Sequence, residues 1–87
     1  MYYVYILKSI QNTSKVYVGF TTDLKKRMVE HNSISNKNTY SSKYKPWDLA
    51  CYIAFKSKNT AEIFERYLKE GSGFAFMKKH LLDKSAA

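Results

Sequence analysis

The sequence has very little cysteine and no long apolar run. Cys51 is the only cysteine among 87 residues, so no disulfide can form within the chain, and a reducing compartment fits best. Cys51 lies in an apolar run, where a thiol is more often buried and inert than nucleophilic. The apolar stretch from Tyr2 to Leu7 is too short for a signal peptide or a membrane span. We therefore expect a cytoplasmic protein that does not contact a membrane.

Acidic residues are also scarce. Seven Asp and Glu stand against fifteen Lys and Arg, which gives a formal net charge of +8. In a small folded domain this charge favours a polyanionic partner, of which nucleic acid is the commonest. A chain kept soluble by lysine has the same excess, so charge alone leaves both interpretations open.

Aromatic residues, in contrast, are abundant. They make up 16% of the sequence and supply the core that a disordered basic tail lacks. The length suits one small domain of modest stability. We expect that domain over residues 1–83 and a frayed C-terminal tail over residues 84–87.

The first third of the chain predicts a β-hairpin. Residues 2–8 have the β-branched and aromatic composition of a strand, and both of its alternating faces are apolar, which favours a central position. Polar residues 9–14 form a turn, and residues 15–20 form the second strand. If the register has an even sum, near Tyr5 opposite Tyr17, the odd-numbered residues Tyr3, Tyr5, Tyr17 and Gly19 share a face. Gly19 inside a strand marks the close approach of another backbone or of a ligand.

A basic helix is expected next. Thr21-Thr22-Asp23 predicts its start, with a hydroxyl cap and an acid in the first turn, and Asn32 its left-handed C-cap. On this helix Arg27 and His31 border the apolar stripe. An arginine in that position must be paired inside the fold or face a cleft.

Residues 33–48 are expected to form a loop in which lysines alternate with aromatic residues. This composition suits nucleic-acid contact through phosphates and stacked bases, and it suits an ordinary exposed loop equally well. The candidate contacts with nucleic acid are Lys25 on the preceding helix, Lys43 and Lys45, with Tyr40, Tyr44 and Trp47 as the candidate stacking rings.

The second half predicts a strand over residues 49–56 and a helix to about Lys69, begun by a capping box of Asn59 and Glu62. Glu65 is the misfit on its apolar face and needs a cation, a metal ion or hydrogen bonds; a salt bridge to a neighbouring lysine is the simplest explanation. Gly71-Ser72-Gly73 ends this helix. A last helix, 73–82, is expected to pack Phe74, Met77 and Leu81.

The order of these motifs resembles the GIY-YIG nuclease domain, and more narrowly its small stand-alone bacterial members. The residues that carry the resemblance are Tyr3-Val4-Tyr5, Tyr17-Val18-Gly19, Asp23-Leu24-Lys25-Lys26-Arg27, Glu30-His31-Asn32 and Glu65-Arg66-Tyr67-Leu68-Lys69. It covers roughly residues 2–82. The family fold is α+β, a three-stranded antiparallel sheet flanked by helices, and the order read from the residues, β-β-α-β-α-α, agrees with it.

The resemblance implies a role for each matching residue. Tyr5 and Tyr17 match tyrosines that orient or deprotonate the attacking water, and Arg27 matches the arginine that contacts the scissile phosphate. His31 matches a frequent polar position, and Glu65 the glutamate that holds one divalent ion, Mg²⁺ or Mn²⁺. Tyr3 stands in place of the first glycine of the family motif, and Val4 in place of isoleucine. An asparagine that completes the site in larger relatives has no clear match.

Two functions follow. The first is a metal-dependent endonuclease that hydrolyses DNA phosphodiester bonds in repair or recombination, acting on branched or damaged DNA, with a protein partner or as a weak homodimer. The second is a non-catalytic or degenerate nucleic-acid-binding module, in which Tyr5 and Tyr17 are ordinary sheet aromatics. The nuclease requires Tyr5, Tyr17, Arg27 and Glu65 to meet across one face of the sheet.

Overall fold

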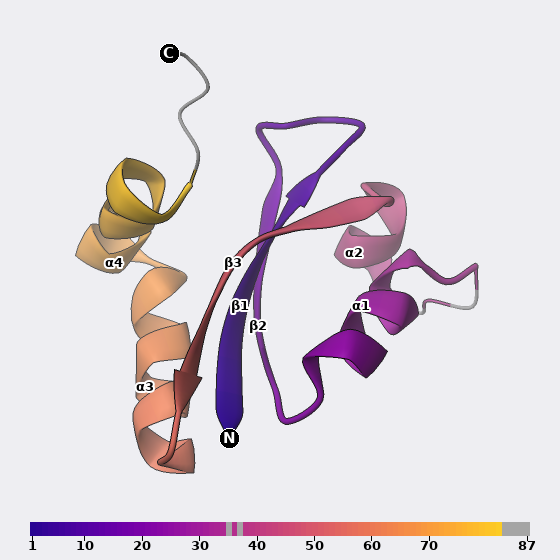
Figure 1. Ribbon diagram of the computed structural model, residues 1–87. Coiled ribbons are helices and arrows are strands. Elements are labelled where there is room, and N and C mark those ends of the chain that lie inside the picture. Colours follow the sequence, from indigo (N-terminus) through magenta and orange to yellow (C-terminus); the bar gives the residue numbers. More distant parts are fainter. Residues whose placement is uncertain (35, 37, 83–87) are drawn as a thin grey trace.

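The computed structural model describes residues 1–34, 36 and 38–82, and its elements follow the predicted order with one addition. They are β1 (Tyr2–Ser9), β2 (Val16–Thr21), α1 (Leu24–Asn32), α2 (Thr39–Lys43), β3 (Trp47–Phe55), α3 (Lys58–Leu68), α4 (Gly71–Phe76) and a π-helical turn, η1 (Met77–Leu81). The strands form an antiparallel sheet of order β2-β1-β3, with helices on both sides (Figure 1). The predicted α+β fold is confirmed. The predicted tail, residues 84–87, lies outside the described residues.

Strand β1 is the centre of the sheet, as its two apolar faces predicted. Each residue from Val4 to Leu7 is at most 1% exposed. Tyr5 pairs with Gly19, and Leu7 with Tyr17. The register sum is even, so the odd-numbered residues do share a face, but the pairing is displaced by one side-chain period from Tyr5 opposite Tyr17.

The two faces of the sheet carry separate apolar clusters. On the odd-numbered face Tyr5, Leu7 and Trp47 are buried, with Leu24 and Met28 of α1 against them. On the other face α3 and the C-terminal helical segment pack against β1 and β2, and the buried residues are Val4, Ile6, Val18, Ala61, Leu68 and Met77. Side chains of α1 and of α3 therefore approach the sheet from opposite sides (Figure 1).

The helix starts differ from the predictions in which residue makes the cap. Helix α1 is capped by the carboxylate of Asp23, which accepts from the amide of Lys26, while the Thr21 hydroxyl accepts from the amide of Asp23. Helix α3 is capped by the Ser57 hydroxyl, which accepts from the amide of Thr60, so the expected box of Asn59 and Glu62 is wrong. In both cases several polar residues compete for the cap, and the one that precedes the first helical residue takes it.

The C-terminal helices follow the predicted break. Gly71 has φ of 58°, a left-handed conformation that suits glycine, and α4 starts there. Met77 is fully buried, but Phe74, expected in the core, is 38% exposed. Helix α4 continues into the π-helical turn η1 from Met77 to Leu81.

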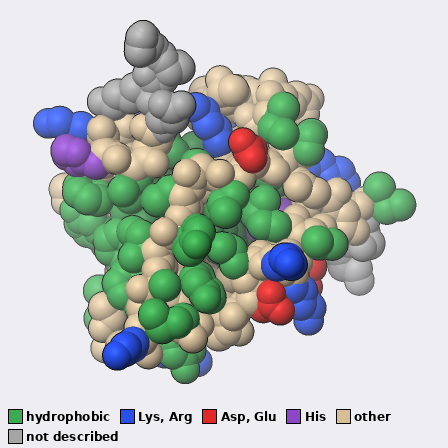
Figure 2. Space-filling model, viewed as in Figure 1, with side chains coloured by type: hydrophobic (Ala, Val, Ile, Leu, Met, Phe, Trp, Pro, Cys, Tyr) green, Lys and Arg blue, Asp and Glu red, His purple; other side chains and the backbone are tan. Residues whose placement is uncertain are grey.

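Part of the apolar surface stays exposed. Figure 2 shows hydrophobic side chains gathered over β3 and α3, with basic side chains scattered around them. Tyr52, Ile63 and Tyr67 contribute to the exposed apolar surface of these two elements. Cys51 on β3 is half-buried, and burial raises the pKa of its thiol. In the described part of the chain no helix has the length and apolar character needed to cross a bilayer.

Candidate active site

An open pocket of about 450 Å³ lies beside α1 and brings together Tyr17, Arg27 and His31. These residues come from β2 and from successive turns of α1, because Arg27 and His31 are one helical turn apart. The remaining lining residues belong to α1 and the segment that follows it: Val29, Glu30, Ser33, Asn36 and Asn38. Three of the five residues predicted to be catalytic therefore line a single cavity.

Tyr5 lies behind this pocket and is completely buried. Its ring lies over Gly19: a Cβ added there would be 2.3 Å from both Cζ and Oη of Tyr5. The close approach predicted for Gly19 is thus made by a side chain rather than by a backbone or a ligand. Strand β2 is an edge strand. Because Gly19 has no side chain, the Tyr5 hydroxyl can reach across β2, where it contacts Nε2 of His31 at 2.9 Å.

The environment of Tyr5 favours its neutral form. Burial raises the pKa of Tyr5 to about 12, and the electrostatic influence of Tyr17 and Glu65 acts in the same direction. Arg27 opposes them, both by its charge and as a hydrogen-bond donor to the phenol. Desolvation outweighs the cation, so Tyr5 is protonated at neutral pH.

The sequence left two possibilities for Arg27, an ion pair or a position facing a cleft, and the structure shows both. It lines the pocket, and its Nε forms an ion pair with Oε1 of Glu30 at 3.0 Å. The two side chains are 41% and 53% exposed. A pair this exposed contributes at most about 1 kcal/mol to stability, so an incoming phosphate can compete for the guanidinium.

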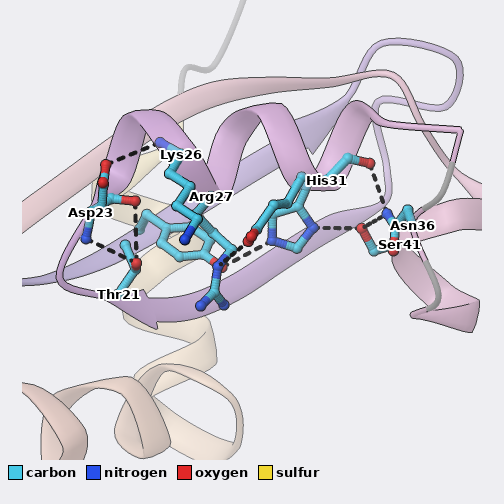
Figure 3. A network of polar contacts seen from close by, with 9 residues as sticks. Thr21, Asp23, Lys26, Arg27, His31, Asn36 and Ser41 are labelled. Atoms are coloured by element: carbon cyan, nitrogen blue, oxygen red, sulfur yellow. Dashed lines mark hydrogen bonds and ion pairs between the residues drawn. The ribbon is translucent and has the colours of Figure 1, made fainter.

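His31 is the most tightly held member of the site, being only 5% exposed. Nε2 faces Tyr5, and Nδ1 lies 2.5 Å from the hydroxyl oxygen of Ser41 (Figure 3). Burial, followed by the positive charge of Arg27, lowers the pKa of His31, and Glu30 acts in the opposite direction. The imidazole is therefore neutral at pH 7.

Tyr17 is the pocket-facing tyrosine. Its ring packs edge-on against His31, with centroids 4.6 Å apart, and is stacked on Tyr5 at 6.3 Å. Tyr40 and Trp47 complete the aromatic surroundings of the Tyr17 ring, at 6.4 and 6.2 Å. Of the two predicted tyrosines, Tyr17 is the half-buried one that lines the cavity.

Asn32 has a structural role, but not as the predicted left-handed cap. No residue other than glycine has a positive φ in the described part of the chain. Asn32 ends α1, and its amide forms two hydrogen bonds with the backbone of Trp47, accepting from N–H at 2.6 Å and donating to C=O at 3.1 Å. This pairing ties the end of α1 to the start of β3.

Sequence reasoning missed Asn36, Ser41 and helix α2. Asn38 caps α2 by accepting from the amide of Ser41. The spacing of Asn38 and Ser41 is an N-cap signal that could have been found within the predicted loop. Trp47, proposed as a stacking ring, is 2% exposed, and its Nε1 donates to the Ser41 carbonyl. It is a core residue, whereas Tyr40 is 41% exposed.

Glu65 is carried by α3, which packs on the other face of the sheet from α1, so the predicted residues do not all meet across one face. Its carboxylate still acts on the phenol, because the charge of Glu65 raises the pKa of Tyr5. Oε2 of Glu65 forms an ion pair with Lys69 at 2.8 Å, the lysine bridge expected as the simplest explanation. Glu65 itself is 19% exposed.

Among the described residues the donor set fits a divalent ion held by a single carboxylate rather than a closed cage of protein ligands. No group of three or more His, Cys, Asp or Glu is arranged for a metal among the described residues. The Lys69 pair engages one oxygen of Glu65, and in the described part of the chain the other oxygen is left for a cation. Mg²⁺ is commonly held by one carboxylate together with substrate phosphates and water, so Glu65 fits that group.

The predicted lysine contacts have different surroundings. Lys25 is exposed on α1. Lys43 is exposed too, with its Nζ 5.4 Å from the centroid of the Tyr44 ring. Lys45 is half-buried and donates to the Ser33 carbonyl at 3.0 Å. Lys25 and Lys43 thus remain accessible to a polyanion, and Lys45 is tied into the fold.

Comparison with known proteins agrees with this geometry. Residues 1–80 match the GIY-YIG catalytic domain. The structure-specific endonuclease subunit SLX1 of Debaryomyces hansenii is 34% identical over 73 residues, covering 78% of this chain and 21% of that protein. A UPF0213 protein of Streptococcus pyogenes serotype M3 is 32% identical over 87 residues, covering 94% of this chain and 90% of that protein. The chain thus spans about a fifth of the first relative and most of the second. It belongs to the GIY-YIG catalytic domain family, the family that its sequence resembles.

Proposed function

We propose that the protein is a metal-dependent endonuclease that hydrolyses DNA phosphodiester bonds, with the scissile phosphate bound in the pocket of Tyr17, Arg27 and His31. The observation that carries the proposal is the convergence of these residues on one open cavity. Phosphodiester hydrolysis needs an activated water, a cation for the charge that develops on phosphorus, and stabilisation of the leaving oxygen. Tyr17 and Arg27 of the pocket are proposed for the first two, and Glu65, on the helix that packs on the other face of the sheet, is proposed to hold the metal ion for the third.

Arg27 is the phosphate-binding residue in this proposal. Its planar guanidinium matches two phosphate oxygens, and an incoming phosphate would compete with the exposed Glu30 carboxylate, which lies 3.0 Å from Nε of Arg27. Tyr17 contacts the attacking water, because its ring lines the pocket whereas Tyr5 is completely buried. Tyr5 supports the site from behind through its contact with His31.

Glu65 would hold one divalent ion, Mg²⁺ or Mn²⁺. When bound, such an ion supplies Lewis-acid stabilisation of phosphate oxygens. In the free protein, Nζ of Lys69 pairs with Oε2 of Glu65 at 2.8 Å. The ion would be held by the other carboxylate oxygen.

The substrate class and partners are part of the same proposal. The net charge of +8 favours a polyanion, and the relative from Debaryomyces hansenii is named as a structure-specific endonuclease subunit. We propose branched or damaged DNA as the substrate, a role in DNA repair, a protein partner or a homodimer, and a cytoplasmic location in keeping with the single cysteine.

A cleavage panel tests this proposal. Single-stranded, duplex and branched DNA, and RNA, are incubated with the purified protein in Mg²⁺, in Mn²⁺ and in a chelator. We expect metal-dependent cleavage of DNA that Glu65→Gln abolishes and Glu62→Gln, a matched change on the same helix, preserves. Salt-sensitive binding without cleavage under every condition would instead establish the non-catalytic binding module. Cleavage that persists in Glu65→Gln would show that Glu65 holds no catalytic ion.

A further inference from the structure

An aromatic platform beside the pocket takes no part in the proposed chemistry. It consists of Tyr40, in the first turn of α2, and Tyr44, which caps the end of that helix. Helix α2 lies beside α1 (Figure 1). Tyr40 is 41% exposed, and its ring centroid lies 5.1 Å from that of Tyr44 and 6.4 Å from that of Tyr17, which lines the pocket. The platform is therefore continuous with the cavity proposed to receive the phosphate.

The Tyr40 ring is held in a fixed orientation. Its Oη donates a hydrogen bond to the carbonyl of Val16 at 3.0 Å, and its ring stacks on Trp47, with centroids 6.1 Å apart and planes 24° from parallel. Trp47 is itself 2% exposed, and its Nε1 donates to the Ser41 carbonyl. A ring that is already fixed loses little conformational entropy when a ligand covers it. Tyr40 can therefore receive a flat ligand at low entropic cost.

Two lysines flank the platform. Nζ of Lys15, which precedes β2, and Nζ of Lys43, in α2, each lie 5.4 Å from the centroid of the Tyr44 ring. The segments that supply these lysines and the platform, residues 1–22 and 31–47, contain no Asp or Glu. Surfaces that bind single-stranded nucleic acid combine such rings and cations, because bases stack on the rings while phosphates pair with the cations.

A base that stacks on a protein ring must be unpaired. In a duplex the faces of each base are covered by its neighbours, so a side chain stacks only on a base that has left the helix. An intact duplex would contact the two lysines through its phosphates alone. An exposed ring beside the pocket thus favours DNA whose bases are already unstacked.

We infer that Tyr40 stacks on an unpaired base next to the scissile phosphate, with Lys15 and Lys43 on neighbouring phosphates, so that DNA with unpaired nucleotides at the cleavage point is the preferred substrate. The place of this nucleotide beside the scissile bond rests on the proposed function, whereas the stacking requires only the platform. Because stacking tolerates any base, Tyr40 selects the structure of the DNA and not its sequence.

Binding of two single-stranded probes in a chelator, without cleavage, tests the inference. Fluorescence anisotropy gives the Kd of the full chain for an oligothymidylate and for an abasic oligonucleotide of the same length, which has the same phosphates but no bases. Because both probes release the same counterions from their phosphates, the ratio of the two Kd values isolates the contribution of the bases. We expect the oligothymidylate to bind at least about fivefold more tightly, the lower end of what stacking on one ring provides.

Variants assign this ratio to one ring. Tyr40→Leu should lower the ratio at least about fivefold and leave the Kd for a blunt duplex unchanged. Tyr40→Phe, which keeps the ring and loses only the hydrogen bond to Val16, should retain the ratio. Tyr52→Leu, which removes a tyrosine that is 52% exposed on β3, should also retain it. Circular dichroism checks that each variant is folded.

A measurement on the unmodified protein does not depend on the folding of any variant. An oligothymidylate that carries iodouracil is crosslinked by light, and mass spectrometry should find the crosslink on Tyr40. Equal Kd values for the two single-stranded probes, a ratio that persists in folded Tyr40→Leu, an equal loss in Tyr52→Leu, or crosslinks only elsewhere would overturn the inference. Absence of metal-dependent cleavage with the ratio intact would instead overturn the proposed nuclease and leave the stacking site standing.

Discussion

Replacement of Gly19 by alanine tests how the site is built into the sheet. The added Cβ would lie 2.3 Å from Cζ and Oη of Tyr5 and 2.8 Å from Cε1, well inside contact distance. Overpacking of a buried site costs about 1–3 kcal/mol. Displacement of the ring also breaks the hydrogen bond between Tyr5 and His31, which adds about 1 kcal/mol.

One effect acts in the opposite direction. Alanine restricts the unfolded chain more than glycine does, which stabilises the folded state by about 0.4–1 kcal/mol. The steric term is larger, so we expect Gly19→Ala to lower the free energy of unfolding by about 1–3 kcal/mol net. Urea unfolding measures this change as a lower midpoint at an unchanged slope.

A double-mutant cycle attributes the loss to Tyr5. In a Tyr5→Leu background the distal ring atoms that meet the new Cβ are absent, so Gly19→Ala should cost almost nothing there. The expected coupling is at least about 1 kcal/mol, as for residues in direct contact. An equal cost in both backgrounds would refute the account of Gly19 as the space for the Tyr5 ring.

Three further predictions concern separate contacts. Asn32→Ala removes both hydrogen bonds to the Trp47 backbone and should cost about 1–3 kcal/mol in urea unfolding; Asn12→Ala in the exposed hairpin turn is the control, and equal costs would contradict the clamp. Burial raises the pKa of Tyr5 from 10 to about 12, so between these pH values the folded state keeps the Tyr5 proton that the unfolded state loses. The contribution of the protonated Tyr5 to the free energy of unfolding is therefore full below pH 10 and is lost as the pH rises to about 12. Tyr5→Phe should lack this part of the decline, and parallel stability curves for the two proteins would refute the assignment. Glu30→Gln frees Arg27 from its ion pair and should lower the Kd for a fluorescent DNA duplex a few-fold in anisotropy titrations at low salt; weaker binding would show that Glu30 positions Arg27 instead.

Features set by local composition were predictable from the sequence. The alternating apolar faces of β1 predicted its central position, and its four buried residues confirm it. The even register sum was a condition of the prediction, and the structure meets it with Tyr5 opposite Gly19, where the Tyr5 ring occupies the space that a side chain would need. A period-two pattern cannot distinguish registers that differ by a full period.

Features that depend on contacts between distant segments were not predictable. Asn32 was interpreted from its place after a helix, yet its partner Trp47 is fifteen residues away. The contact of Ser41 with His31 likewise joins segments whose approach is decided by α2, a short helix within a stretch of loop-like composition. The position of Glu65 on a helix facing the other side of the sheet also follows from packing, because its helical spacing identifies a buried face but not the layer against which that face packs.

The most direct test of the central claim is the single-turnover cleavage rate of DNA by Arg27→Ala compared with Lys26→Ala. Arg27 lines the pocket, whereas the neighbouring Lys26 has the same charge, is exposed and is absent from the lining of that pocket. We predict that Arg27→Ala lowers the metal-dependent rate by at least about a hundredfold, as for other groups that stabilise charge in the transition state, and that Lys26→Ala changes it only slightly. Equal rates for the two variants, with folding intact, would contradict the assignment of this pocket as the active site.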